Sequence, residues 1–121
     1  MVGTEAARDF VVLVQHQRPD LMRQVLPKLE AQVRDGNADP ADFAMMFDRM
    51  QMYDRKPQRY GSNFECAPDK RLVPTPIEQP ATLDERRAAI GLMPMRLYTR
   101  LLLAMYPKDF CTKALAASPP K

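Results

Sequence analysis

The chain has 121 residues, of which 45% are hydrophobic and 27% charged, a balance typical of one soluble globular domain. Its formal net charge of +3 is too small to indicate a dedicated nucleic-acid binder, which usually shows a clustered basic face. No stretch approaches the roughly 18 consecutive apolar residues that a membrane-spanning helix needs, and the N-terminus lacks a signal-peptide pattern. The sequence therefore predicts a cytoplasmic protein without a membrane segment.

Two helices are predicted in the first 36 residues. The first covers residues 4–17 and ends before Pro19, because the residue preceding a proline resists the helical conformation. The second begins at Asp20 and ends at Gly36, and Pro27 falls on its polar side, where it should produce a kink toward solvent. The apolar face of this second helix consists of Met22, Leu26, Leu29 and Val33.

A third helix has the clearest start signal in the chain. Asp39 can cap the helix and Pro40 can occupy its first position. Apolar side chains then surround the helix on nearly all sides, which predicts a central, buried element. Pro57 prevents the helix from continuing.

The segment of residues 55–81 holds five of the twelve prolines and shows no helical periodicity. Within it, residues 58–66 and 71–77 could pair as a short hairpin. A loop of more than twenty residues is too long for a simple connector in a small domain, so we expect an ordered and functional segment.

Two more helices are predicted in the last third of the chain. Thr82 and Glu85 form a capping-box pattern, and Gly91 should end that helix in the left-handed conformation. The last helix lies between Pro94 and Pro107. The predicted fold is mainly α: a compact array of about five helices with one irregular or hairpin insertion at residues 55–81, a single domain over residues 1–110, and a flexible tail over residues 111–121.

The two cysteines, Cys66 and Cys111, are 45 positions apart. Their spacing fits no metal-site pattern, so the sequence predicts no metal and no cofactor. Reduced thiols are the favoured interpretation in a cytoplasmic protein. A Cys66–Cys111 disulfide is the alternative, and it would require an oxidising compartment.

Arg49 is a candidate site residue because its helical neighbours are apolar. The side chains three and four positions away are Met45, Met46, Met52 and Tyr53. A cation in such surroundings must extend to solvent, pair with a carboxylate, or enter a polar pocket. We keep two interpretations, a structural ion pair and a group that binds an anionic ligand.

His16 and the Tyr60-Gly61 turn are the other candidates. His16 ends the first helix on an apolar face, where a structural role competes with a catalytic one. Gly61 permits a tight turn, and polar groups flank it on both sides. Short catalytic motifs such as GxSxG, HExxH and a phosphate-binding Gly-rich loop are absent, which leaves open whether the protein is an enzyme.

The succession LVQHQ, LPKLEAQVRDG, FAMMFDRM, KPQRYGSNFEC and PTPIEQPATLDERRAAIGL resembles an uncharacterised family of bacterial domains of unknown function, over most of residues 2–100. Members of that family typically contain LVQH, a DR pair, QxYGTQ and PIEDP…VDERRAALGL. This chain has Ser62-Asn63 where Thr-Gln is usual, and it looks short at its N-terminus. The resemblance draws attention to His16, Asp48, Arg49, Gln58, Tyr60 and Gly61.

The residues together suggest a polar pocket made by His16, Arg49 and residues 58–63. It would bind a small anionic or amide-bearing ligand, and turnover of that ligand is left open. The expected catalytic residues are His16, Arg49 and Tyr60, and the expected ligand-binding residues are Asp48, Gln58, Gly61 and Asn63. The alternative is a non-enzymatic interaction module, or a subunit of a larger complex, that uses its Met-rich and apolar helical surfaces. Self-association through the N-terminal helix is also expected.

Overall fold

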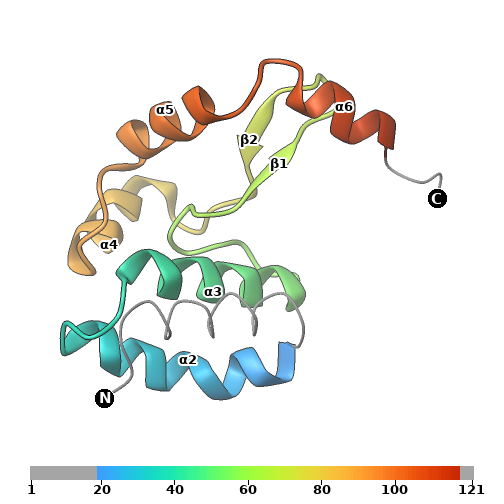
Figure 1. Cartoon of the computed structure of the whole chain (residues 1–121). Coiled ribbons are helices and arrows are strands. Elements are labelled where there is room, and N and C mark those ends of the chain that lie inside the picture. The colour runs from blue at the N-terminus through green and yellow to red at the C-terminus, as the bar shows by residue number, and fades with distance from the viewer. Residues whose placement is uncertain (1–18, 118–121) are drawn as a thin grey trace.

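The computed structural model describes residues 19–117, and the first predicted helix, with His16, lies outside these residues. Figure 1 shows two layers: α2 (Pro19–Arg34) and α3 (Pro40–Tyr53) lie side by side in opposite directions, and a second layer of shorter elements lies above α3. The second layer contains β1 (Phe64–Cys66), β2 (Leu72–Pro74), the 3-10 turn η1 (Pro80–Thr82), α4 (Leu83–Ala89), α5 (Met95–Met105) and α6 (Phe110–Ala117).

The core between α2 and α3 follows the predicted helical faces. Met22 and Leu29 of α2 are buried against Phe43, Met46 and other side chains of α3. Pro27 lies inside α2 but is exposed, so the helix continues past it as expected. These contacts remove apolar surface from water, which is the main source of stability for a small helical domain.

The start of α3 is as predicted, because the Asp39 side chain accepts a hydrogen bond of 2.9 Å from the Ala41 amide, with Pro40 as the first helical residue. The prediction of a capping box at Thr82 is wrong. Its hydroxyl makes no cap hydrogen bond to the helix but donates to the Gln79 carbonyl and accepts from Arg86, because η1 precedes α4 directly.

The predicted hairpin is present as a two-stranded antiparallel sheet, in which Phe64 pairs with Pro74 and Cys66 with Leu72. A mainly α fold with one hairpin insertion is thereby confirmed, with five α-helices among residues 19–117. None of the helices in this part of the chain is long and apolar enough to cross a bilayer.

The interpretation of the cysteines as free thiols is wrong. Cys66 of β1 and Cys111 of α6 form a disulfide, with their Cα atoms 5.4 Å apart. Residues 111–117 are helical, where the sequence suggested a flexible tail, because Cys111 is buried and bonded to the hairpin. A bond between elements far apart in sequence leaves little trace in local sequence patterns.

Candidate functional site

Asp48 organises the loop that follows α3. Its carboxylate is completely buried and accepts hydrogen bonds from the main-chain amides of Arg59, Tyr60 and Ser62 and from the Ser62 hydroxyl, at 2.7–3.0 Å. A carboxylate with this number of donors offsets the cost of its own burial. Asp48 therefore shapes the loop, and its two oxygens are occupied by the protein itself.

Gln58 has a similar structural role. Its side-chain amide donates to the carbonyls of Asn63 and Thr75 and accepts from the Asn63 amide, each at 2.9 Å. These bonds close the loop of residues 58–63 and join it to Thr75, the residue that follows β2. Asn63 is buried, and its Nδ2 atom has no hydrogen-bond partner among the described residues.

Gly61 forms the turn of this loop with a φ of +73°. A Cβ at this position would lie 2.8 Å from Sδ of Met95 and 3.4 Å from Cδ2 of Leu83. The loop therefore needs glycine for two reasons, its left-handed backbone and the close approach of α4 and α5.

We expect Gly61→Ala to lower the free energy of unfolding by about 1–2 kcal/mol, mainly through backbone strain and to a smaller extent because the end of the flexible Met95 side chain must move. Gly36→Ala is the matched control, because Gly36 has a φ of +76° but nothing within 4 Å of the added Cβ. That control should cost only about 1 kcal/mol. If urea unfolding gives the same loss of free energy for Gly61→Ala and Gly36→Ala, contact with Met95 adds nothing to the cost of the substitution at Gly61.

Arg87 of α4 is a buried cation, only 2% exposed. Its Nε donates to the Met93 carbonyl at 2.7 Å, and its Nη1 donates to the Tyr60 carbonyl at 2.6 Å. The guanidinium also lies 4.8 Å from the centre of the Tyr98 ring. Burial lowers the pKa of Arg87 below its ordinary value, although an arginine stays charged at neutral pH.

No carboxylate pairs with Arg87 among the described residues. Ion pairs in this part of the chain include Arg23–Asp54, Glu30–Arg34, Asp69–Arg71 and Asp109–Lys113, and none of these involves Arg87. A buried charge is normally paired, since removing it from water is costly. Arg87 is instead hydrogen bonded to neutral carbonyls and packed on an aromatic ring, while Asp84 and Asp48 act on its charge without direct contact.

A cavity of about 190 Å³ lies against Arg87, and we name it the Arg87 cavity. Its walls come from α3, the loop of residues 58–63, α4, the connection between α4 and α5, and α5 itself. Its polar groups belong to Ser62, Arg87 and Tyr98, and its apolar lining is Ala41, Ala44, Met45, Gly91, Leu92 and Met93. The Tyr98 hydroxyl is 3.5 Å from the Ser62 carbonyl, too long for a strong hydrogen bond, so it can serve another acceptor. Burial also raises the pKa of Tyr98, which keeps this hydroxyl protonated.

The structure does not bring Arg49 and Tyr60 together. The Tyr60 ring packs against Phe43 and Phe47, with centroids 5.9 and 5.7 Å away. Arg49 follows Phe47 by two positions, about 200° around an α-helix, and therefore faces another side of α3. Its Nε atom is buried without a hydrogen-bond partner among the described residues, and neither Arg49 nor Tyr60 lines the Arg87 cavity.

Sequence reasoning missed Arg87, although a signal was present. Leu83 and Arg87 are four positions apart and are the buried residues of α4, so Arg87 occupies an apolar helical position. The argument that selected Arg49 applies equally to this arginine. Ser62 and Tyr98 had no comparable signal, because only the folded chain brings them beside α4.

Residues 1–110 match a family of unknown function, DUF6624. The chain belongs to this family. The expectation of an uncharacterised domain family is thereby confirmed, whereas no curated protein and no solved structure matches the chain. The DUF6624 match takes in Asp48, its loop and every residue of the Arg87 cavity, and it ends at the first residue of α6.

The part of the chain from residue 19 to residue 117 has no group of three His, Cys, Asp or Glu side chains that could hold a metal ion. The chemistry of the Arg87 cavity is instead that of a cation and two hydroxyls within an apolar lining. Such a set of groups can bind an anion through charge and hydrogen bonds.

Proposed function

We propose that this domain binds a small ligand with an anionic group on a short apolar body, in the Arg87 cavity. The observation that carries the proposal is the buried guanidinium of Arg87, which lines a cavity and has no carboxylate partner among the described residues. A bound anion would offset the cost of burying this charge.

The contacts of Arg87 also define how the anion would bind. Nε and Nη1 already donate to main-chain carbonyls, and these bonds hold the guanidinium plane in one orientation. Nη2 has no such bond among the described residues and remains as a donor. The Tyr98 hydroxyl would be a second donor, so a carboxylate could receive one hydrogen bond on each oxygen.

The lining and size of the Arg87 cavity favour a small ligand. Most of its walls are aliphatic or methionine side chains, which suit an aliphatic or compact aromatic body. A volume of about 190 Å³ is below the usual range of drug-sized sites, about 300–1,000 Å³. A short-chain carboxylate fits both features better than a nucleotide.

Turnover is not part of this proposal. Among residues 19–117, no cysteine or carboxylate lines the Arg87 cavity. The Ser62 hydroxyl lies 2.7 Å from Asp48, but that carboxylate already accepts three main-chain amides. It therefore serves better as a scaffold than as a general base.

A thermal-shift titration with butyrate, benzoate and inorganic phosphate tests the proposal, because a ligand that binds the folded state raises the melting temperature. We expect a carboxylate to bind and its uncharged amide to bind much more weakly. Arg87→Gln should weaken binding about 10- to 100-fold, as expected for a lost hydrogen bond to a charged group.

Arg86→Gln is the matched control. Arg86 carries the same charge on the same helix and also donates to main-chain carbonyls, including those of Arg59 and Glu78, but it does not line the cavity. Ala41→Leu, which should fill the cavity while keeping Arg87, is a second variant in case Arg87→Gln unfolds. Equal binding by Ala41→Leu and the unmodified chain, or no binding of any carboxylate, would overturn the proposal.

A further inference from the structure

A second concave surface lies away from the Arg87 cavity. It is bounded by the hairpin turn, the C-terminal end of α5 and the start of α6, and has a volume of about 370 Å³. We name it the hairpin groove. Apolar side chains line it, among them Leu72, Leu103, Tyr106 and Phe110. Cys111 of α6 also lines the groove, and its disulfide with Cys66 attaches α6 to β1. The groove is therefore held open by a covalent bond as well as by packing.

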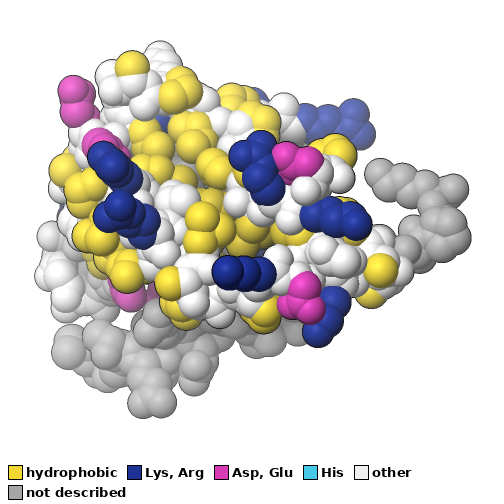
Figure 2. Space-filling model, turned by 90° about the horizontal axis from the view of Figure 1, so that it is seen from above, with side chains coloured by type: hydrophobic (Ala, Val, Ile, Leu, Met, Phe, Trp, Pro, Cys, Tyr) yellow, Lys and Arg dark blue, Asp and Glu magenta, His cyan; other side chains and the backbone are white. Residues whose placement is uncertain are grey.

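Helix α5, whose Leu103 lines the hairpin groove, carries further exposed apolar side chains on another side. No residue of α5 is buried, and Leu97, Leu101 and Met105, which are four positions apart, have exposed fractions of 47%, 47% and 79%. Seen from this side, hydrophobic side chains gather across the middle of the surface (Figure 2). Apolar side chains gathered on one face are typical of a binding surface, whereas isolated exposed apolar residues are ordinary.

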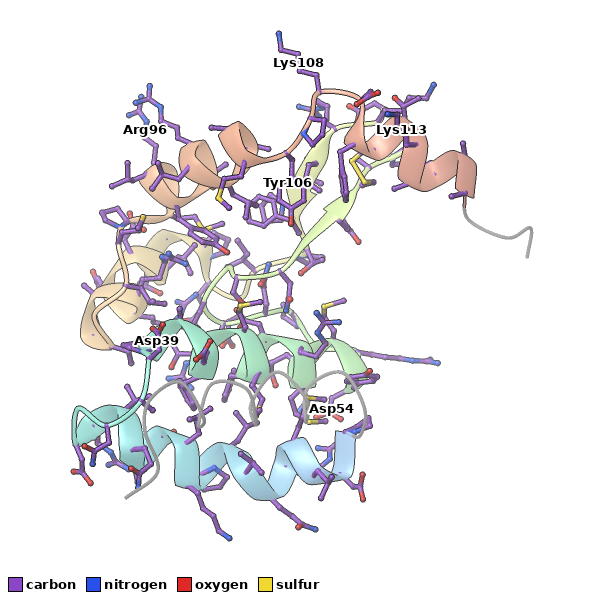
Figure 3. The ribbon with its side chains drawn as sticks, in the orientation of Figure 1. Asp39, Asp54, Arg96, Tyr106, Lys108 and Lys113 are labelled. Carbon is purple, nitrogen blue, oxygen red and sulfur yellow. A yellow bond between two sulfur atoms is a disulfide. The ribbon has the colours of Figure 1, made fainter. Side chains whose placement is uncertain are left out.

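Cations surround the apolar area. Lys70, Arg71 and Lys108 line the hairpin groove, and Arg96 and Arg100 lie on α5, which has no acidic residue. Arg96 and Lys108 point away from the body of the molecule (Figure 3). Arg71 is paired with Asp69 at 2.6 Å, so the other cations carry most of the available charge. This charge is complementary to an acidic partner.

We propose that this face docks an acidic protein segment, which inserts an apolar side chain into the hairpin groove and places its carboxylates against the surrounding cations. The concave shape favours a protein over a membrane surface, because a groove accepts an anchoring side chain and a lipid surface has none to offer. This site is independent of the Arg87 cavity, since the two share no residue.

Selection from a phage-displayed library of random peptides tests this proposal with a defined probe. We expect the enriched peptides to combine Asp or Glu with Leu or Phe. Synthetic copies of these peptides should bind the full chain in fluorescence anisotropy. The double variant Lys70→Asp with Lys108→Glu should bind them at least about tenfold more weakly. Asp is chosen at position 70 because Lys70 has a φ of +68°, which Asp tolerates better than most residues.

The control reverses two exposed charges elsewhere, Lys28→Glu with Lys56→Glu, and should leave peptide binding unchanged. Both double variants should have the same melting temperature as the unmodified chain, because all four lysines are exposed. Enrichment of neutral or basic peptides, or equal weakening by both double variants, would overturn the proposal. Binding to phosphatidylglycerol vesicles without any acidic peptide consensus would overturn it in favour of a membrane.

Discussion

Replacing Asp48 by Asn should lower the free energy of unfolding by about 3–4 kcal/mol. The amide of Asn keeps one acceptor oxygen but puts an NH2 group in place of the other. Oδ2 of Asp48 now accepts from both the amide and the hydroxyl of Ser62. In the variant this NH2 group would face the Ser62 amide, a donor against a donor at a position where the Asp48 side chain is fully buried, so the loop should lose its conformation.

Urea unfolding monitored by circular dichroism measures this loss, and Ser62→Ala provides the comparison. Ser62→Ala removes the hydroxyl bond but keeps the three main-chain amides on the carboxylate. It should cost only about 1 kcal/mol, the usual net value of one hydrogen bond. If Asp48→Asn proves no more costly than Ser62→Ala, the carboxylate is not the organiser of the loop.

Removing the Cys66–Cys111 bond should cost about 4 kcal/mol, the value that chain entropy gives for a closed loop of about 45 residues. The expected result is a clearly lower urea midpoint after reduction, together with loss of α6 from its position on β1. The double variant Cys66→Ala with Cys111→Ala should show the same midpoint with and without reductant.

That double variant also serves as the control for the reductant itself. Added reductant should destabilise the unmodified chain only, because the variant has no bond to break. A midpoint that does not move on reduction, with both thiols shown to be free by alkylation, would contradict the expected contribution.

Local signals in the sequence predicted much of the helical framework. Three of these features depend on neighbours within a few positions: the start of α3 at Asp39-Pro40, the apolar face of α2 and the left-handed Gly91 after α4. Capping, helical periodicity and glycine geometry act over this short range. The two strands of the hairpin are also close in sequence, which is why a hairpin could be expected within residues 55–81.

The interactions that shape the candidate site act over longer distances in the chain. Asp48 reaches Ser62 across 14 positions, and Arg87 reaches Tyr60 across 27. A single sequence marks a polar residue as unusual but does not identify its partner. Gln58 was therefore expected to bind a ligand, whereas its amide is hydrogen bonded to the chain itself.

The bond between Cys66 and Cys111 makes a closed ring of the chain from β1 to α6, and α5 lies within that ring. A protease that cut the exposed α5, for example after Arg100, would leave two pieces still joined through sulfur. The hairpin and α6 would remain attached to each other, and the nicked molecule would separate only after reduction. The ring thus protects the assembly of this layer against a break in its most exposed helix.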